Sequence, residues 1–158
     1  MRLTRKQLTF VISSLVVIGL LGGWFYWSNN GLVNVKIDYE DEDAVALGKI
    51  LYAQHCASCH GANLEGQFNW RKRQPNGRLL APPHDATGHT WHHDDQHLFA
   101  ITKFGTAAVV GGNYETDMRG YEDELSDREI LAVLGFIKST WPKIVQKRHD
   151  DINRRARD

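Results

Sequence analysis

Residues 56–60 form a C-x-x-C-H motif that contains the only two cysteines of the chain. This spacing is the attachment signature for c-type haem, because two thiols one helical turn apart can each bond a vinyl group of one porphyrin. A C-x-x-C pair can also be a thiol–disulfide redox pair or half of a zinc site. The zinc interpretation lacks a second cysteine pair, and the redox interpretation lacks a recognisable βαβ context. We therefore expect one haem c, covalently bound through Cys56 and Cys59, with His60 beside the iron.

An uncharged segment of 20 residues, 8–27, precedes this motif and ends in a cluster of four aromatic residues. Twenty largely apolar residues in a helix span a bilayer core, and aromatic rings favour its interface. We expect an uncleaved transmembrane anchor at 8–27 that contacts membrane lipid. The basic residues within 1–7 should keep the N-terminus in the cytoplasm. The alternative is a cleaved signal peptide, although no A-x-A-like cleavage site is evident.

The charge of the chain is balanced, with 19 basic and 19 acidic residues. Because basic residues flank the apolar segment, the part after residue 30 has 16 basic and 19 acidic residues, a net charge of −3. A nucleic-acid-binding domain is expected to be strongly basic. We therefore expect no nucleic-acid partner.

A polar linker, residues 28–41, should connect the anchor to the folded domain. Residues 33–38 alternate between apolar and polar types, which fits either a short strand or a tether. Acidic residues at 40–43 favour the start of a first helix, because carboxylates stabilise the positive end of the helix dipole. This helix should run into the haem motif, with an apolar stripe of Val45, Leu47, Ile50, Leu51 and Tyr52.

Two more helices are expected after the haem motif. A loop at 61–93 leads to a helix at 94–104, which Gly105 should end and which turns Leu98, Phe99 and Ile101 inward. A second loop, 106–125, precedes the last core helix. Its start is marked by a capping box of Ser126 and Glu129, and it should end near Trp141, before Pro142. A charged tail, residues 142–158, with a composition compatible with a helix, follows.

This order of elements resembles the class I cytochrome c family, in a membrane-anchored form with one haem, over residues 42–141. The resemblance implies an all-α fold whose first and last helices cross beside a covalently bound haem. Gly48 and Tyr52 match the family's glycine and aromatic positions on the first helix. Val133 and Phe136 match their counterparts on the last helix. Since Gly48 has no side chain, an aromatic ring can lie closely across its helix.

The resemblance also implies the axial ligands of the iron. His60 matches the proximal ligand, and Met118 matches the distal ligand, in an acidic loop before the last helix. Packing is the alternative role of Met118, but a polar loop is a poor place for a core residue. His/Met ligation raises the reduction potential of haem. The backbone carbonyl of either Pro82 or Pro83 should accept a hydrogen bond from the proximal imidazole.

Further haem contacts are expected from residues that can donate hydrogen bonds to the haem propionates, because buried carboxylates need partners. The candidates are Trp91, Tyr121, Arg71 and Arg78.

Five histidines are concentrated within residues 84–97: His84, His89, His92, His93 and His97. His93 and His97 are four residues apart and would share a helix face, a spacing that can bind copper or zinc. The alternatives are a solvated, hydrogen-bonding loop, or a histidine as the distal ligand in bis-histidine haem.

The family resemblance implies a single-electron carrier rather than an enzyme, with redox partner proteins and a place in a respiratory or related chain. Covalent haem attachment in this family belongs to the outer face of the bacterial cytoplasmic membrane, which agrees with the predicted topology. The domain should therefore face the periplasm from a single-pass anchor. The alternatives are a ligand-binding or sensing haem protein, and a copper-handling protein that uses the histidine-rich loop.

Overall fold

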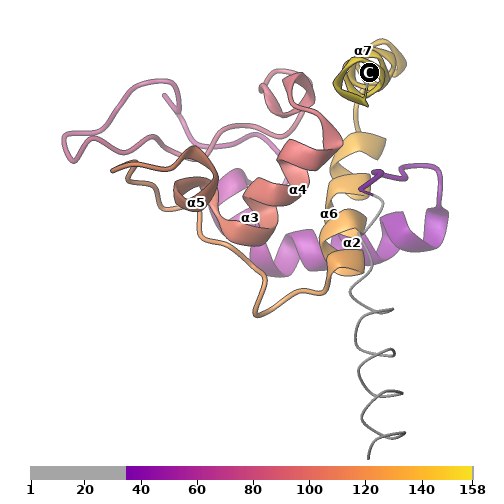
Figure 1. Ribbon diagram of the computed structural model, residues 1–158, viewed down its shortest axis with the longest axis horizontal. Coiled ribbons are helices and arrows are strands. Elements are labelled where there is room, and N and C mark those ends of the chain that lie inside the picture. Colours follow the sequence, from indigo (N-terminus) through magenta and orange to yellow (C-terminus); the bar gives the residue numbers. More distant parts are fainter. Residues whose placement is uncertain (1–34, 158) are drawn as a thin grey trace, which may run out of the picture. The chain divides into compact units, whose positions relative to one another are not determined.

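The computed structural model describes residues 35–157, which contain only helices and loops (Figure 1). The predicted anchor at 8–27 lies outside these residues, and no helix among 35–157 is long and apolar enough to cross a membrane. Apart from one isolated bridge between Gly105 and Arg119, the described chain has no β-structure, as the all-α prediction requires. The helices are α2 (Glu42–His55), α3 (Ala57–His60), the 3-10 helix η1 (Thr90–His92), α4 (Asp95–Phe104), α5 (Thr106–Val110), α6 (Asp127–Ser139) and α7 (Lys143–Arg157).

The fold is organised by α2 and α6, which cross each other and make the most extensive helix–helix contact (Figure 1). Gly48 lies at the crossing, where a Cβ atom would be 2.0 Å from the backbone oxygen of Ala132. The rings of Tyr52 and Phe136 meet there with their centroids 5.5 Å apart. The predicted crossing of the first and last core helices is therefore confirmed, but the group closest to Gly48 is the backbone of Ala132 and not the predicted aromatic ring.

The apolar stripe predicted for α2 was partly wrong. Leu51 and Tyr52 are buried, but Leu47 and Ile50 are 36 % and 57 % exposed. The face that packs on α6 is centred on Gly48, because the bare backbone there allows the closest approach of the two helices. Leu47 and Ile50 lie on the other side of the helix.

The predicted helix ends were largely confirmed, because their signals are local. Asp41 caps α2 through the amides of residues 43 and 44, and Asp94 caps α4 through the amide of His97. Gly105 ends α4, and Ser126 and Glu129 form both bonds of the capping box of α6. The segments at 61–93 and 106–125 were predicted to be loops, but they contain the short helices η1 and α5.

The charged tail is part of the folded domain. It forms α7, which buries one face against the rest of the fold: Val145, Gln146, His149 and Asn153. The segment at 35–41, predicted to belong to the linker, also packs on the domain and forms no strand. Its Ile37 is only 2 % exposed, and a Cβ on Gly135 of α6 would be 2.6 Å from the backbone oxygen of Asp38.

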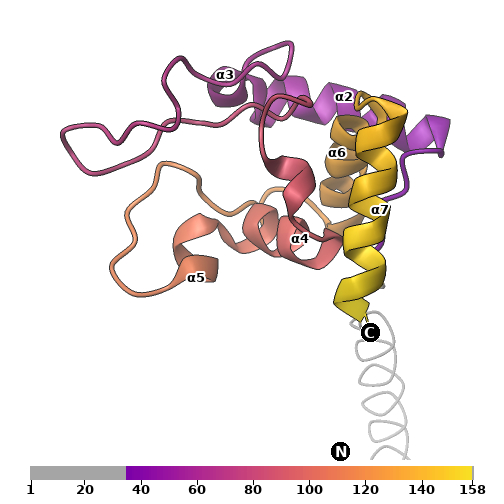
Figure 2. The ribbon, with the colours of Figure 1, turned by 90° about the horizontal axis from the view of Figure 1, so that it is seen from above.

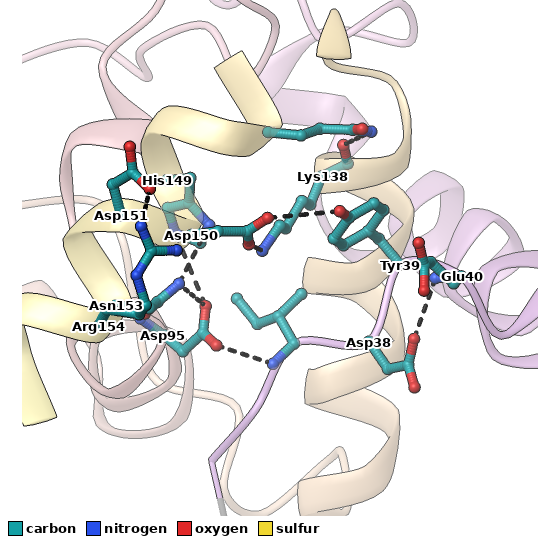
Figure 3. A network of polar contacts seen from close by, with 12 residues as sticks. Asp38, Tyr39, Glu40, Asp95, Lys138, His149, Asp150, Asp151, Asn153 and Arg154 are labelled. Atoms are coloured by element: carbon teal, nitrogen blue, oxygen red, sulfur yellow. Dashed lines mark hydrogen bonds and ion pairs between the residues drawn. The ribbon is translucent and has the colours of Figure 1, made fainter. Parts of the chain in front are cut away.

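A buried carboxylate joins this segment, α4 and α7 (Figure 3). Asp95, at the start of α4, accepts the backbone N–H of Ile37 at 3.0 Å. It also pairs with Asn153 of α7. The Asn153 side-chain amide donates to the Asp95 carboxylate at 2.9 Å and accepts the Asp95 backbone N–H at 2.7 Å. These bonds span 58 residues and hold both ends of the described chain on the core.

Lys138 and His149 are the two fully buried polar side chains next to this carboxylate. Lys138 of α6 donates to Asp150 at 2.6 Å and lies over the ring of Tyr39. His149 Nε2 donates to the backbone oxygen of His93 at 2.9 Å, and its Nδ1 accepts from Asn153 at 3.3 Å. Because Nδ1 acts as an acceptor, the imidazole is neutral in this arrangement.

Acid should weaken the fold through His149. Burial, followed by the charge of Lys138, lowers the pKa of His149, although Asp95, the His93 carbonyl and Asp150 act in the opposite direction. The unfolded state therefore binds more protons below the ordinary histidine pKa of about 6.5. The contribution of His149 to stability is complete above that pH and is lost as the pH falls toward the lowered folded value.

Denaturant titrations of the wild type and of His149→Gln between about pH 5 and pH 7 test this sign. The free energy of unfolding should fall more steeply with acid in the wild type than in the variant. Equal slopes would show that His149 does not keep a lowered pKa in the folded protein.

Candidate functional site

The haem motif lies where α2 gives way to α3. Cys56 is both the C-cap of α2 and the N-cap of α3, so the first thiol lies at the junction of the two helices and Cys59 lies within α3. The two cysteines do not form a disulfide with each other. Burial, followed by the nearby Cys59, raises the pKa of the Cys56 thiol to about 11. Thiol–disulfide oxidoreductases typically have a cysteine with a lowered thiol pKa, and the pKa of Cys56 is shifted in the opposite direction.

The imidazole of His60 is buried and held by one backbone carbonyl. Its Nδ1 lies 2.8 Å from the carbonyl oxygen of Pro82. Because the carbonyl can only accept, Nδ1 carries the proton and Nε2 is left with its lone pair. Of the two prolines considered from the sequence, it is therefore Pro82 that contacts His60.

The Pro82 carbonyl is placed by tight packing around Pro83. A Cβ on Gly88 would lie 1.9 Å from the Pro83 backbone oxygen, so only glycine allows the loop to fold back here. The next residue, His84, donates its backbone N–H to Leu64 at 2.8 Å. This packing fixes the segment that orients His60.

His84 and Trp141 help to hold the His60 ring in place, a role that was not predicted from the sequence. The His84 ring stacks on the His60 ring, with centroids 3.9 Å apart and planes 24° apart. The Trp141 indole donates to the His84 backbone oxygen at 2.7 Å across 57 residues. The position of His84 directly after the two prolines was the one sequence signal that could have suggested it.

The Met118 loop is attached to the end of α4. The backbone oxygen of Met118 accepts from Thr106 at 3.3 Å, and its N–H donates to the Thr116 hydroxyl at 3.0 Å. Tyr121 donates its backbone N–H to Lys103 at 2.9 Å. The Met118 side chain is half-buried and packs against the core. Among residues 35–157 it is the only thioether.

Arg78 connects this loop to the long loop at 61–89. Its Nη1 lies 2.5 Å from the carboxylate of Asp117, the residue before Met118. Its Nε is buried and has no hydrogen-bond partner, although it lies 3.8 Å from the carboxylate of Glu115. A buried N–H without a partner is costly, so the site has a donor available for an anionic group such as a haem propionate. Two cysteines that form no disulfide with each other, an oriented imidazole, a thioether and this donor together fit haem c.

The other predicted propionate donors bond elsewhere. The Trp91 indole donates to Ala86 O at 3.3 Å, and the Tyr121 hydroxyl donates to His55 O at 2.8 Å. The guanidinium of Arg71 lies over the Trp70 ring, 4.2 Å from its centroid. A haem contact of Trp91, Tyr121 or Arg71 stays a prediction.

The rings of the histidine-rich segment pack in pairs, and those of His89 and His93 meet edge to face. His93 precedes the N-cap of α4, so it does not share a helix face with His97 as the i, i+4 spacing implied. Their rings stack face to face, with centroids 4.6 Å apart. Among the described residues no group of three or more metal-ligating side chains comes together. The geometry therefore does not support the predicted copper site at His93 and His97.

An all-helical domain with a C-x-x-C-H motif at the end of its first helix defines a c-type haem protein. A family model described as Cytochrome c matches residues 45–141, more than half of the chain. The protein belongs to the cytochrome c family, as the class I resemblance predicted. A search of curated proteins and a search of solved structures each returned no match.

Family membership defines the cofactor and the general role. The protein carries haem c, bound covalently through Cys56 and Cys59, and it is an electron-transfer protein. The bound haem supplies an iron that exchanges one electron with redox partner proteins.

Proposed function

We propose that this protein is a membrane-tethered single-electron carrier whose haem iron is ligated by His60 and Met118. The hydrogen bond between His60 Nδ1 and Pro82 O supports this proposal most directly, because it leaves Nε2 available for the iron. Met118 supports it as the sole thioether of residues 35–157, in a loop bonded to the end of α4. With both axial positions filled by protein, no substrate reaches the iron, and the site serves electron transfer alone.

The role of the polypeptide is to keep the two proposed iron ligands in fixed positions. Stacking of His84 on His60, and the bonds of the Met118 loop to residues 103, 106 and 116, restrict motion of both ligands. A rigid ligand set keeps the reorganisation on electron transfer small, and His/Met ligation gives a positive potential suited to a respiratory or related chain.

The tether is proposed from residues 8–27, which would place the haem domain on the outer, periplasmic face of a bacterial cytoplasmic membrane. Tethering raises the effective concentration of the carrier near membrane-bound partners. Carboxylates around Met118 would orient a partner with a basic docking surface: Glu115, Asp117, Glu122, Asp123 and Glu124.

Purification of the full chain from membranes, followed by a redox titration, tests this proposal. We expect the haem protein in the membrane fraction, a reversible one-electron titration at clearly positive potential, and no binding of carbon monoxide by the ferrous form. A five-coordinate ferrous spectrum would overturn the carrier function in favour of ligand binding. Recovery in the soluble fraction would overturn the tether alone.

A further inference from the structure

The charge of the described chain is divided between α7 and the rest of the fold. Residues 35–141 have ten basic and sixteen acidic residues, whereas α7 has two aspartates and six cationic side chains. All six are exposed: Lys143, Lys147, Arg148, Arg154, Arg155 and Arg157. A basic helix attached to an acidic domain indicates a negatively charged binding surface for the helix.

These cations are available for binding because the fold uses the opposite face of α7. The inner face is held by His149 and Asn153, and Asp150 pairs with Lys138. Among residues 35–157, Arg154 is the only one of the six that pairs with a carboxylate, that of Asp151. The outer face therefore keeps most of its positive charge.

The C-terminal end of α7 lies beside the point where the described chain begins. Lys36, Arg154 and Arg157 line the same open pocket, of about 320 Å³, which is also lined by the carboxylates of Asp38, Glu40, Asp95 and Asp150. The Ile37–Asp95–Asn153 bonds hold this arrangement (Figure 3). Only residues 28–34 separate Val35 from the predicted anchor. Seven residues reach at most about 25 Å when fully extended, so an anchor at 8–27 would keep the arginine-rich end close to the membrane surface.

We propose that the outer face of α7 binds anionic phospholipid headgroups and so orients the haem domain on the membrane. Guanidinium groups bind phosphate through paired hydrogen bonds, and each cation near an anionic surface strengthens binding about fivefold. The acidic loop between α5 and α6 extends away from α7 in both views (Figures 1 and 2). It would therefore face away from the lipid, toward a redox partner. This inference rests on the tether proposed above.

The test uses the full haem-loaded chain in vesicles of phosphatidylcholine alone or mixed with phosphatidylglycerol. Electron paramagnetic resonance of the ferric haem in oriented bilayers reports the orientation of the haem plane. We expect strong angular dependence in the mixed lipid and little in phosphatidylcholine alone. Arg154→Gln with Arg155→Gln and Arg157→Gln should weaken docking roughly 100-fold and abolish the angular dependence.

The matched control is Lys49→Gln with Lys72→Gln and Arg128→Gln, which removes the same charge from exposed positions outside α7. It should retain the angular dependence, and thermal melting should show that both triple variants stay folded. An orientation that is equal in both lipids, or equal in both triple variants, would overturn the lipid contact.

Flotation of the same samples separates this inference from the tether. If residues 8–27 do not anchor the protein in a membrane, it should not bind to phosphatidylcholine vesicles. Binding to the mixed vesicles alone, if lost in the α7 triple variant, would support the lipid contact while overturning the anchor. Binding to neither lipid would overturn both.

Discussion

Met118→Ala is expected to lower the reduction potential by roughly 100 mV or more and to let the ferrous iron bind carbon monoxide. The thioether favours ferrous iron, and its removal opens one axial position. The loop around it is held by backbone bonds at residues 106 and 121, so the loop should survive the loss of the side chain. Redox titration and carbon monoxide difference spectra of the purified variant measure the two effects.

Met118→His separates ligation from packing. Histidine supplies a nitrogen ligand in place of sulfur. This variant should therefore have a lower reduction potential than the wild type, as Met118→Ala should, but it should not bind carbon monoxide. If Met118 only packs against the core, Met118→Ala would lower the melting temperature while the potential and the ligand binding stay as in the wild type. That result would refute the ligand assignment.

Gly48→Ala is expected to lower the free energy of unfolding by about 2 kcal/mol or more. Helix propensity alone predicts the opposite, a gain of about 1 kcal/mol from replacing glycine in a helix. The added Cβ would lie 2.0 Å from the Ala132 oxygen and 2.5 Å from its carbonyl carbon, so α2 and α6 must move apart. A loss of stability would therefore show that the close packing of α2 on α6 dominates, and a gain would show that local helix propensity dominates.

Guanidinium chloride unfolding of the haem-loaded protein measures this change. Ala46→Gly, at an exposed position of the same helix, should cost only the propensity difference of about 1 kcal/mol. Combining Gly48→Ala with Ala132→Gly should not restore stability, since the contact is with the backbone of residue 132. Stabilisation by Gly48→Ala would show that the helices do not cross at this position.

Much of the site could be predicted from the sequence because the residues that mark each feature lie within a few positions of one another. The spacing of Cys56, Cys59 and His60 is set within one helical turn, and the capping box at Ser126 acts within four residues. Helix ends at Asp94 and Gly105 depend likewise on neighbouring backbone groups. Each of these features was confirmed in the structure.

The choice between Pro82 and Pro83, and the support of His60 by His84 and Trp141, depended on distant contacts. The Trp141–His84 bond joins residues 57 apart, and no local pattern encodes it. The exposure of Leu47 and Ile50 was missed for the same reason, because their side of α2 is determined by where α6 approaches Gly48.

The sequence by itself determined the covalent haem attachment and the order of helices, because thiol spacing, caps and periodicity act over a few residues. The tertiary structure alone decided that residues 35–41 and α7 belong to the domain. Their docking depends on Asp95, which meets Ile37 and Asn153 from 58 residues away on either side. A buried carboxylate needs its hydrogen-bond partners wherever they lie in the chain, and only the folded chain brings them together.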